Sequence, residues 1–136
     1  MEAQRMKYDA FLGEVQHRLE LATEGDAARA ARIVLETLGQ RIGEGEASDL
    51  ASQLPREIGR HLTKVEGGEQ FSYQVFIERI AERAEIDESD ANYYAQAIAA
   101  LVADCVQGGE LAQVRAQLPD DYDDLFELVD AKATPW

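Results

Sequence analysis

The chain contains 136 residues, and its 27 Asp and Glu residues outnumber its 13 Lys and Arg residues, which gives a formal net charge of −14. Chains of this length usually fold as one domain around a single core. A charge of this sign repels phosphate backbones and anionic lipid headgroups, so we expect neither nucleic acid nor a membrane as a partner. It also indicates a halophilic, salt-adapted source, because concentrated salt screens the repulsion between surface carboxylates.

The cysteine content and the N-terminal sequence both predict a cytoplasmic protein. A single cysteine, Cys105, excludes an internal disulfide and a multi-cysteine zinc site. Residues 1–15 carry charges where a secretory signal needs an unbroken apolar stretch, and no run of about 18 uncharged apolar residues occurs in the chain.

The spacing of apolar residues predicts an all-α fold. Apolar side chains recur every three or four residues, and no segment alternates as a strand does. In the first part of the chain we expect helices over 8–22, 27–42, about 46–53 and about 55–62. Pro55 would stand in the first turn of the fourth helix, where a proline loses no hydrogen bond.

The sequence then repeats itself at a distance of 64 residues. The tripeptide Gln-Leu-Pro occurs twice at this spacing, as Gln53, Leu54 and Pro55 and as Gln117, Leu118 and Pro119. The apolar positions of the second helix also recur 64 residues later, whereas the first helix aligns better at 65. We predict a bundle of about eight helices built from two tandem four-helix repeats, approximately 7–62 and 72–128, joined by a hinge at 63–71.

The two repeats are expected to form one domain, residues 1–136. Each repeat has about 60 residues and would be only marginally stable alone, so the two should share one core.

The combination of an alanine-rich second helix, a glycine turn and a short helix ending in Gln-Leu-Pro, all repeated, resembles a known family. It is the prokaryotic family catalogued as domain of unknown function 2267, and the resemblance covers roughly residues 6–128. The resemblance implies a duplicated helical fold, and it implies no activity and no catalytic residues.

We interpret Gln-Leu-Pro as a corner of the fold that is built twice. Each leucine would fill the core, and each proline would set the first turn of the next helix. Each glutamine could offer a donor and an acceptor to backbone groups left unpaired at the junction. The alternative is that both glutamines point outward as a twofold recognition site.

The residues that carry most enzyme chemistry do not form a recognisable constellation, so we expect no catalytic residue, no cofactor and no metal. Glu14 and His17 have the Glu-x-x-His spacing of di-iron bundles, but the repeat supplies no second copy. His61 is interpreted as a half-buried structural histidine. Cys105 lies near the C-terminal end of a helix, where the dipole opposes a thiolate.

Two further segments allow more than one interpretation. The acidic run 120–130 is typical of a solvated helix face, with a low-affinity cation site as the alternative. Tyr93 and Tyr94 either fill and edge the core or form, with Trp136, an aromatic patch that contacts a partner. The tail that ends in Trp136 is predicted to be disordered or loosely docked, with a recognition peptide as the alternative.

These observations favour a non-enzymatic protein-interaction module that binds a protein partner or a second copy of itself. The alternative is a small-ligand sensor with an apolar pocket between the two repeats. A closed, filled junction with an exposed apolar patch would favour the first hypothesis, and an enclosed cavity of about 300 Å³ or more would favour the second.

Overall fold

The computed structural model describes residues 6–136 and is all-helical over this range, with eight α-helices and one 3-10 helix. The elements are α1 (Tyr8–Arg18), α2 (Glu24–Arg41), α3 (Glu44–Ala51), α4 (Arg56–Thr63), α5 (Tyr73–Ala84), α6 (Glu88–Cys105), α7 (Gly108–Ala116), the 3-10 helix η1 (Asp120–Phe126) and α8 (Glu127–Asp130). The prediction of an all-α fold with about eight helices is confirmed. Within the described residues, every helix is too short or too polar to span a lipid bilayer.

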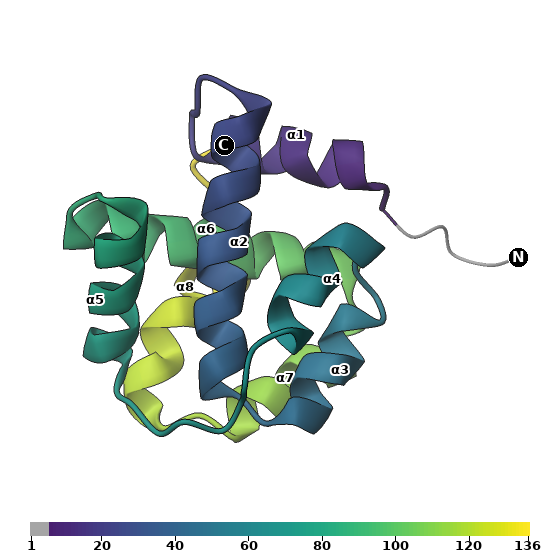
Figure 1. Ribbon diagram of the computed structural model, residues 1–136, viewed down its shortest axis with the longest axis vertical. Coiled ribbons are helices and arrows are strands. Elements are labelled where there is room, and N and C mark those ends of the chain that lie inside the picture. The colour runs from purple at the N-terminus through teal and green to yellow at the C-terminus, as the bar shows by residue number, and fades with distance from the viewer. Residues whose placement is uncertain (1–5) are drawn as a thin grey trace, which may run out of the picture.

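The two long helices, α2 and α6, organise the bundle. In Figure 1, α2 stands upright in the middle and α6 crosses behind it. Both α1 and α5 pack against both long helices, α3 and α4 lie to one side of α2, and α5 and α8 lie to the other. One continuous cluster of buried apolar side chains contains residues from both proposed repeats, so the two halves share a core.

Local hydrogen bonds explain where these helices begin. Thr23 caps α2, because its Oγ1 accepts from the N–H of Asp26 at 3.0 Å, and Asp87 caps α6 by accepting from the N–H of Asp90 at 2.8 Å. The two helices have 18 residues each, and their first residues are 64 positions apart. This agreement supports the interpretation of a tandem repeat.

The first helix ends earlier than predicted, at Arg18 rather than near residue 22. Glu20 adopts a left-handed conformation with φ of 53°, and the N–H of Leu21 donates back to the carbonyl of Gln16 at 2.9 Å. This is a Schellman turn, which terminates a helix. The same turn closes α5 at Glu85, with φ of 58°. Glycine usually marks such turns, and glutamate at both positions concealed them from the sequence analysis.

The corner after each Gln-Leu-Pro also differs from the prediction. Pro55 is the N-cap of α4 and not a residue of its first turn. Pro119 precedes the 3-10 helix η1 and then α8, so the expected single fourth α-helix of the second half is replaced by two shorter elements.

The segment expected to be a hinge is hydrogen-bonded to the end of α2. The α4 helix extends to Thr63, and in the following segment the N–H of Gly68 donates to the carbonyl of Ile42 at 2.9 Å. The Nε of Arg41, a buried residue, donates to the carbonyl of Phe71 at 2.8 Å. These bonds hold the connection between the two halves in one place.

Candidate functional site

The residues with catalytic or metal-binding potential are dispersed. His17 is exposed on α1, and Glu14 pairs with Arg18 at 2.9 Å. Over residues 6–136, no three His, Cys, Asp or Glu side chains are grouped closely enough to hold a metal ion.

Cys105 is the last residue of α6 and is partly buried. Burial and the neighbouring Asp104 carboxylate raise the pKa of its thiol to about 11. Because the thiolate is the reactive form, this environment opposes use of Cys105 as a nucleophile.

The short helices α3 and α7 pack against each other, and each is followed by one of the two Gln-Leu-Pro corners. Leu54 is fully buried, and Leu118 is 9% exposed, so both leucines belong to the core. The Oε1 of Gln53 accepts from the backbone N–H of Gln107 at 2.8 Å. Gln107 is the N-cap of α7, so the glutamine of the first half satisfies a helix end in the second half.

The second glutamine lies in the corresponding place. Gly43 is the N-cap of α3, and a Cβ added to it would lie 3.8 Å from Oε1 of Gln117. Each glutamine is therefore near the N-terminus of the other half's short helix, whereas the sequence analysis assigned each to its own junction. Gln117 itself is exposed.

The aromatic residues of the predicted patch are distributed over two places. The hydroxyl of Tyr93 donates to the carbonyl of Arg18 at 2.9 Å, and the Arg18 guanidinium lies 4.4 Å from the centre of the Trp136 ring. Tyr94 instead lines a pocket of about 200 Å³ beside Ile86. The structure brings Tyr93 and Trp136 to the same arginine, and it places Trp136 against α1.

The acidic run 120–130 has local structural roles. Asp121 accepts from the backbone N–H of Tyr73 at 2.7 Å, at the start of α5. Asp130 and Asp123 pair with Arg115 at 2.9 Å and 3.6 Å. The remaining carboxylates of this run are exposed: Asp120, Asp124 and Glu127.

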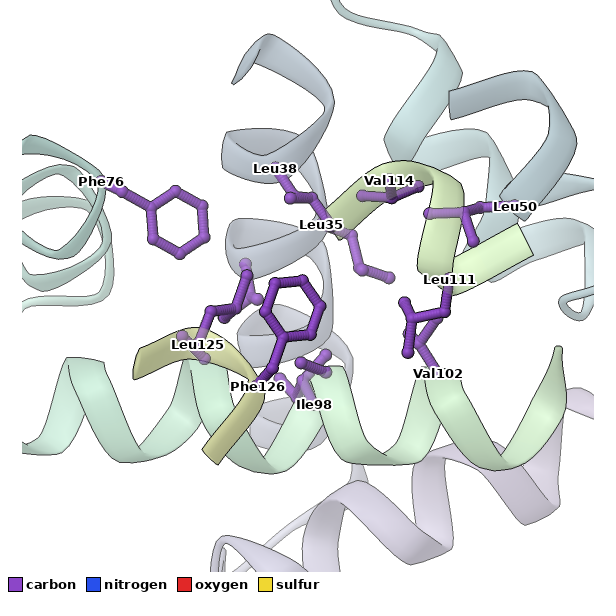
Figure 2. Close-up of a pocket in the computed structure, with 13 residues that line it drawn as sticks. Leu35, Leu38, Leu50, Phe76, Ile98, Val102, Leu111, Val114, Leu125 and Phe126 are labelled. Atoms are coloured by element: carbon purple, nitrogen blue, oxygen red, sulfur yellow. The ribbon is translucent and has the colours of Figure 1, made fainter. Parts of the chain in front are cut away.

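The junction between the two halves is filled. Figure 2 shows apolar side chains from α2, α3, α5, α6, α7 and η1 pointing toward one another at this place. The cavity left between them is about 20 Å³, close to the space of a single water molecule, and its lining is apolar. It is far below the roughly 300 Å³ that a small-molecule site needs.

A larger opening lies beside α7. We call it the α7–α8 groove, and its volume is about 270 Å³. It is lined by Ala103 of α6, by Gly108, Leu111, Ala112 and Arg115 of α7, by Phe126 of η1 and by Val129 of α8. Leu111 and Val129 are partly exposed here, although both pack against the core. The sequence analysis did not single out these residues.

The groove exists in the second half because large side chains replace small ones there. In the first half, a Cβ on Gly59 would lie only 2.6 Å from the carbonyl oxygen of Ala51, so α4 packs directly on the backbone of α3. The residues 64 positions later are Asp123 and Arg115. Their side chains do not fit at so short a separation of the two backbones. In the described chain, α7 packs against α3 but not closely against η1 or α8.

Gly39 on the long helix α2 likewise allows a close helix contact in the first half. A Cβ on Gly39 would clash with the carbonyl oxygen of Leu62, which shows how closely α2 and α4 approach. The residue 64 positions after Gly39 is Ala103, which lies in the groove wall. The replacement of glycine was the signal in the sequence that could have predicted the groove.

Comparisons with known proteins agree with the helical architecture. Residues 8–125 match the model of a family described as "Uncharacterized conserved protein (DUF2267)". A comparison with curated proteins gives no match.

Proposed function

Because this chain belongs to the family of uncharacterized conserved proteins DUF2267, whose description names no activity, we propose a function from its structure. We propose that it is a non-enzymatic helical module that binds a protein partner in the α7–α8 groove. The observation that carries this proposal is the groove itself, where Leu111 and Val129 remain partly exposed beside a filled core.

The surroundings of the groove define the chemistry of the partner. The acidic run 120–130 contributes two of its lining residues, Phe126 and Val129, and two of its carboxylates, Asp123 and Asp130, pair with the lining residue Arg115. Asp120, Asp124 and Glu127 of the same run are exposed and form no ion pair with the described residues. A partner segment should therefore place one or two apolar side chains in the groove and flank them with lysine or arginine. The proposed occupant of the groove is a basic amphipathic helix of another protein. A second copy of this chain also carries a net charge of −14, so like charges oppose self-association at this surface.

The small-ligand alternative receives less support. The cavity between the two halves measures about 20 Å³, and its apolar lining would keep it dry. A ligand could enter only if the junction between α2, α6 and η1 were first pushed apart.

The proposal is tested with a defined peptide. The probe is a fluorescent amphipathic helix with leucine and phenylalanine on one face and lysines beside them, and the assay is fluorescence anisotropy. The test variant is Ala112→Gln, which places a longer polar side chain in the groove, and the control is Ala116→Gln on the exposed surface of the same helix. We expect the test variant to weaken binding at least tenfold and the control to leave it within twofold.

Two other results would overturn the proposal. Equal binding of a peptide in which glutamate replaces every lysine would show that charge complementarity does not operate. A dimer of the wild-type chain in sedimentation experiments that Ala112→Gln converts to a monomer would assign the groove to a second copy. NMR shift mapping should place the bound peptide on α7 and α8.

A further inference from the structure

A second surface feature, a pocket lined by basic side chains, lies between α1, α2 and α4. Its volume is about 510 Å³, and its lining includes Arg29, Arg32, Arg60 and Lys64. The whole chain has 13 basic residues and a net charge of −14, so four of these 13 meet at one place on an otherwise acidic protein. This clustering of positive charge indicates a site for an anion.

The helices bring these cations together by regular spacing. Arg29 and Arg32 stand three residues apart on α2, and Arg60 of α4 stands four residues before Lys64, the C-cap of that helix, so each pair shares one helix face. The close approach of α2 and α4 at Gly39 then places the two faces beside each other.

The charges in this basic pocket are only partly neutralised. Glu36 accepts from Lys64 at 2.6 Å and from Arg32 at 3.4 Å. At the end of α5, Arg29 donates to the carbonyl of Arg83 at 3.0 Å and pairs with the Glu85 carboxylate at 3.5 Å. The Arg60 guanidinium has no hydrogen bond or ion pair with any residue of the described chain.

The charge balance gives the size of the excess. The second carboxylate near the pocket is Glu57, which is part of its lining. A third carboxylate, Glu85, pairs with Arg29 at 3.5 Å, so the four cations Arg29, Arg32, Arg60 and Lys64 exceed the carboxylates by one positive charge.

His61 lies in the wall of the pocket, and its pKa responds to the positive charges there. Burial, followed by the Lys64 ammonium, lowers the pKa of His61 to about 4, and Arg32 and Arg60 act in the same direction. The ring is therefore neutral at pH 7. Its Nδ1 is buried and has no hydrogen-bond partner among the described residues.

We propose that the basic pocket binds the phosphate group of a small anionic ligand, with Arg60 and Lys64 donating to its oxygens. A phosphate monoester carries close to two negative charges at neutral pH, so the local positive excess and the unpaired Arg60 guanidinium attract it. A guanidinium can hold two phosphate oxygens at once, and an ammonium adds a point charge. The overall charge of −14 opposes a polyanion such as nucleic acid, so the ligand is a small molecule.

The two histidines provide the experiment. His61 lies in the pocket. His17 is exposed on α1, nine residues beyond the pocket residue Tyr8 and therefore about 13 Å along the helix. Inorganic phosphate is titrated at pH 7 with sodium chloride keeping the ionic strength constant, and the imidazole signals are followed by NMR. We expect the His61 signals to shift with saturation while the His17 signals stay in place.

Matched charge variants complete the test. Arg60→Gln removes a pocket cation, and Arg56→Gln removes an exposed cation of the same helix that does not line the pocket. We expect Arg60→Gln to raise the dissociation constant about tenfold, as for loss of a charged hydrogen bond, and Arg56→Gln to change it less than twofold. Equal effects of the two variants, or equal shifts of both histidines, would overturn the proposal.

A second titration distinguishes the source of the phosphate. Phenyl phosphate carries an aromatic group that could pack against Tyr8, which also lines the pocket. Binding that is tighter than that of inorganic phosphate, with the difference lost in Tyr8→Ala, assigns the pocket to an organic phosphate ester. Equal affinities assign it to free phosphate. Absence of His61 shifts with both probes up to about 10 mM would exclude a phosphate site, since even a site with a dissociation constant of about 1 mM would be nearly saturated at that concentration.

Discussion

Gly59 provides a sharp test of how the first half is closed. It is a buried residue in the middle of α4, and a Cβ built on it would lie 2.6 Å from the oxygen, 3.0 Å from the Cα and 3.1 Å from the carbonyl carbon of Ala51. All three are backbone atoms of α3. A Gly59→Ala substitution can therefore be accommodated only if the two helices move apart.

Two opposing terms determine the size of the effect. Overpacking of a filled core costs about 1–3 kcal/mol, and three backbone contacts at these distances place Gly59→Ala near the upper value. Alanine is favoured over glycine inside a helix by about 1 kcal/mol. The free energy of unfolding should therefore fall by about 2 kcal/mol.

The assay is urea denaturation followed by circular dichroism, with Gly13→Ala as the matched control. Gly13 lies in α1, and no atom lies within 4 Å of its added Cβ, so only the propensity term applies there. Gly13→Ala should raise the free energy of unfolding by about 1 kcal/mol. A Gly59→Ala protein as stable as wild type would refute the close α3–α4 contact as we describe it.

Four further substitutions test the corners, and one alkylation reaction tests the thiol. Leu54→Ala should lower the free energy of unfolding by about 2–5 kcal/mol, and Leu118→Ala should lie at the lower end because its side chain is 9% exposed; urea unfolding measures both. Gln53→Ala should cost about 0.5–1.5 kcal/mol through loss of its bond to a helix N-terminus, whereas Gln117→Ala should change stability by less than about 0.5 kcal/mol. Equal costs would contradict this difference. The pKa of Cys105 is raised to about 11 from an ordinary 9.0, so less of its thiol is ionised. Alkylation by iodoacetamide at pH 8 should therefore be about 100-fold slower in the folded than in the unfolded chain. Mass spectrometry measures both rates, and equal rates would disprove the prediction.

Local patterns predicted the fold class because helices leave local signals. The three- and four-residue spacing gave the fold class, and the repeated Gln-Leu-Pro gave two corners whose leucines are indeed buried. The end of α1 was missed because a glutamate, Glu20, occupies the left-handed position where glycine is usual. The 3-10 form of η1 was missed because the four-residue spacing of Tyr122 and Phe126 is typical of an α-helix.

Neither candidate site could be predicted from local patterns. The basic pocket combines Arg32 of α2 with Arg60 of α4, and only the close packing of those helices shows that they are neighbours. The α7–α8 groove exists because α7 does not pack closely against η1 or α8, and residue spacing along one helix does not reveal this. Positions where the two proposed repeats differ in size or charge were the informative ones.

The salt response tests the halophilic interpretation of the acidic surface. At 0.1 M salt the Debye length is about 10 Å, so the exposed carboxylates of the net −14 chain repel one another, and at 1 M it is about 3 Å. The melting temperature should therefore rise by at least about 5 °C from 0.1 M to 2 M KCl, since about 1–2 kcal/mol shifts it by that much.

The matched variant for this measurement is Asp120→Asn/Asp124→Asn in the acidic run. Both residues are exposed, and neither carboxylate forms an ion pair with the described residues, so the change removes repulsion without breaking a contact. Its melting temperature at 0.1 M KCl should exceed that of wild type, and its rise with salt should be smaller, because less repulsion remains to be screened. Excluded salt would strengthen apolar burial equally in both proteins, so parallel curves would assign the rise to that effect. A flat wild-type curve would remove the halophilic interpretation altogether.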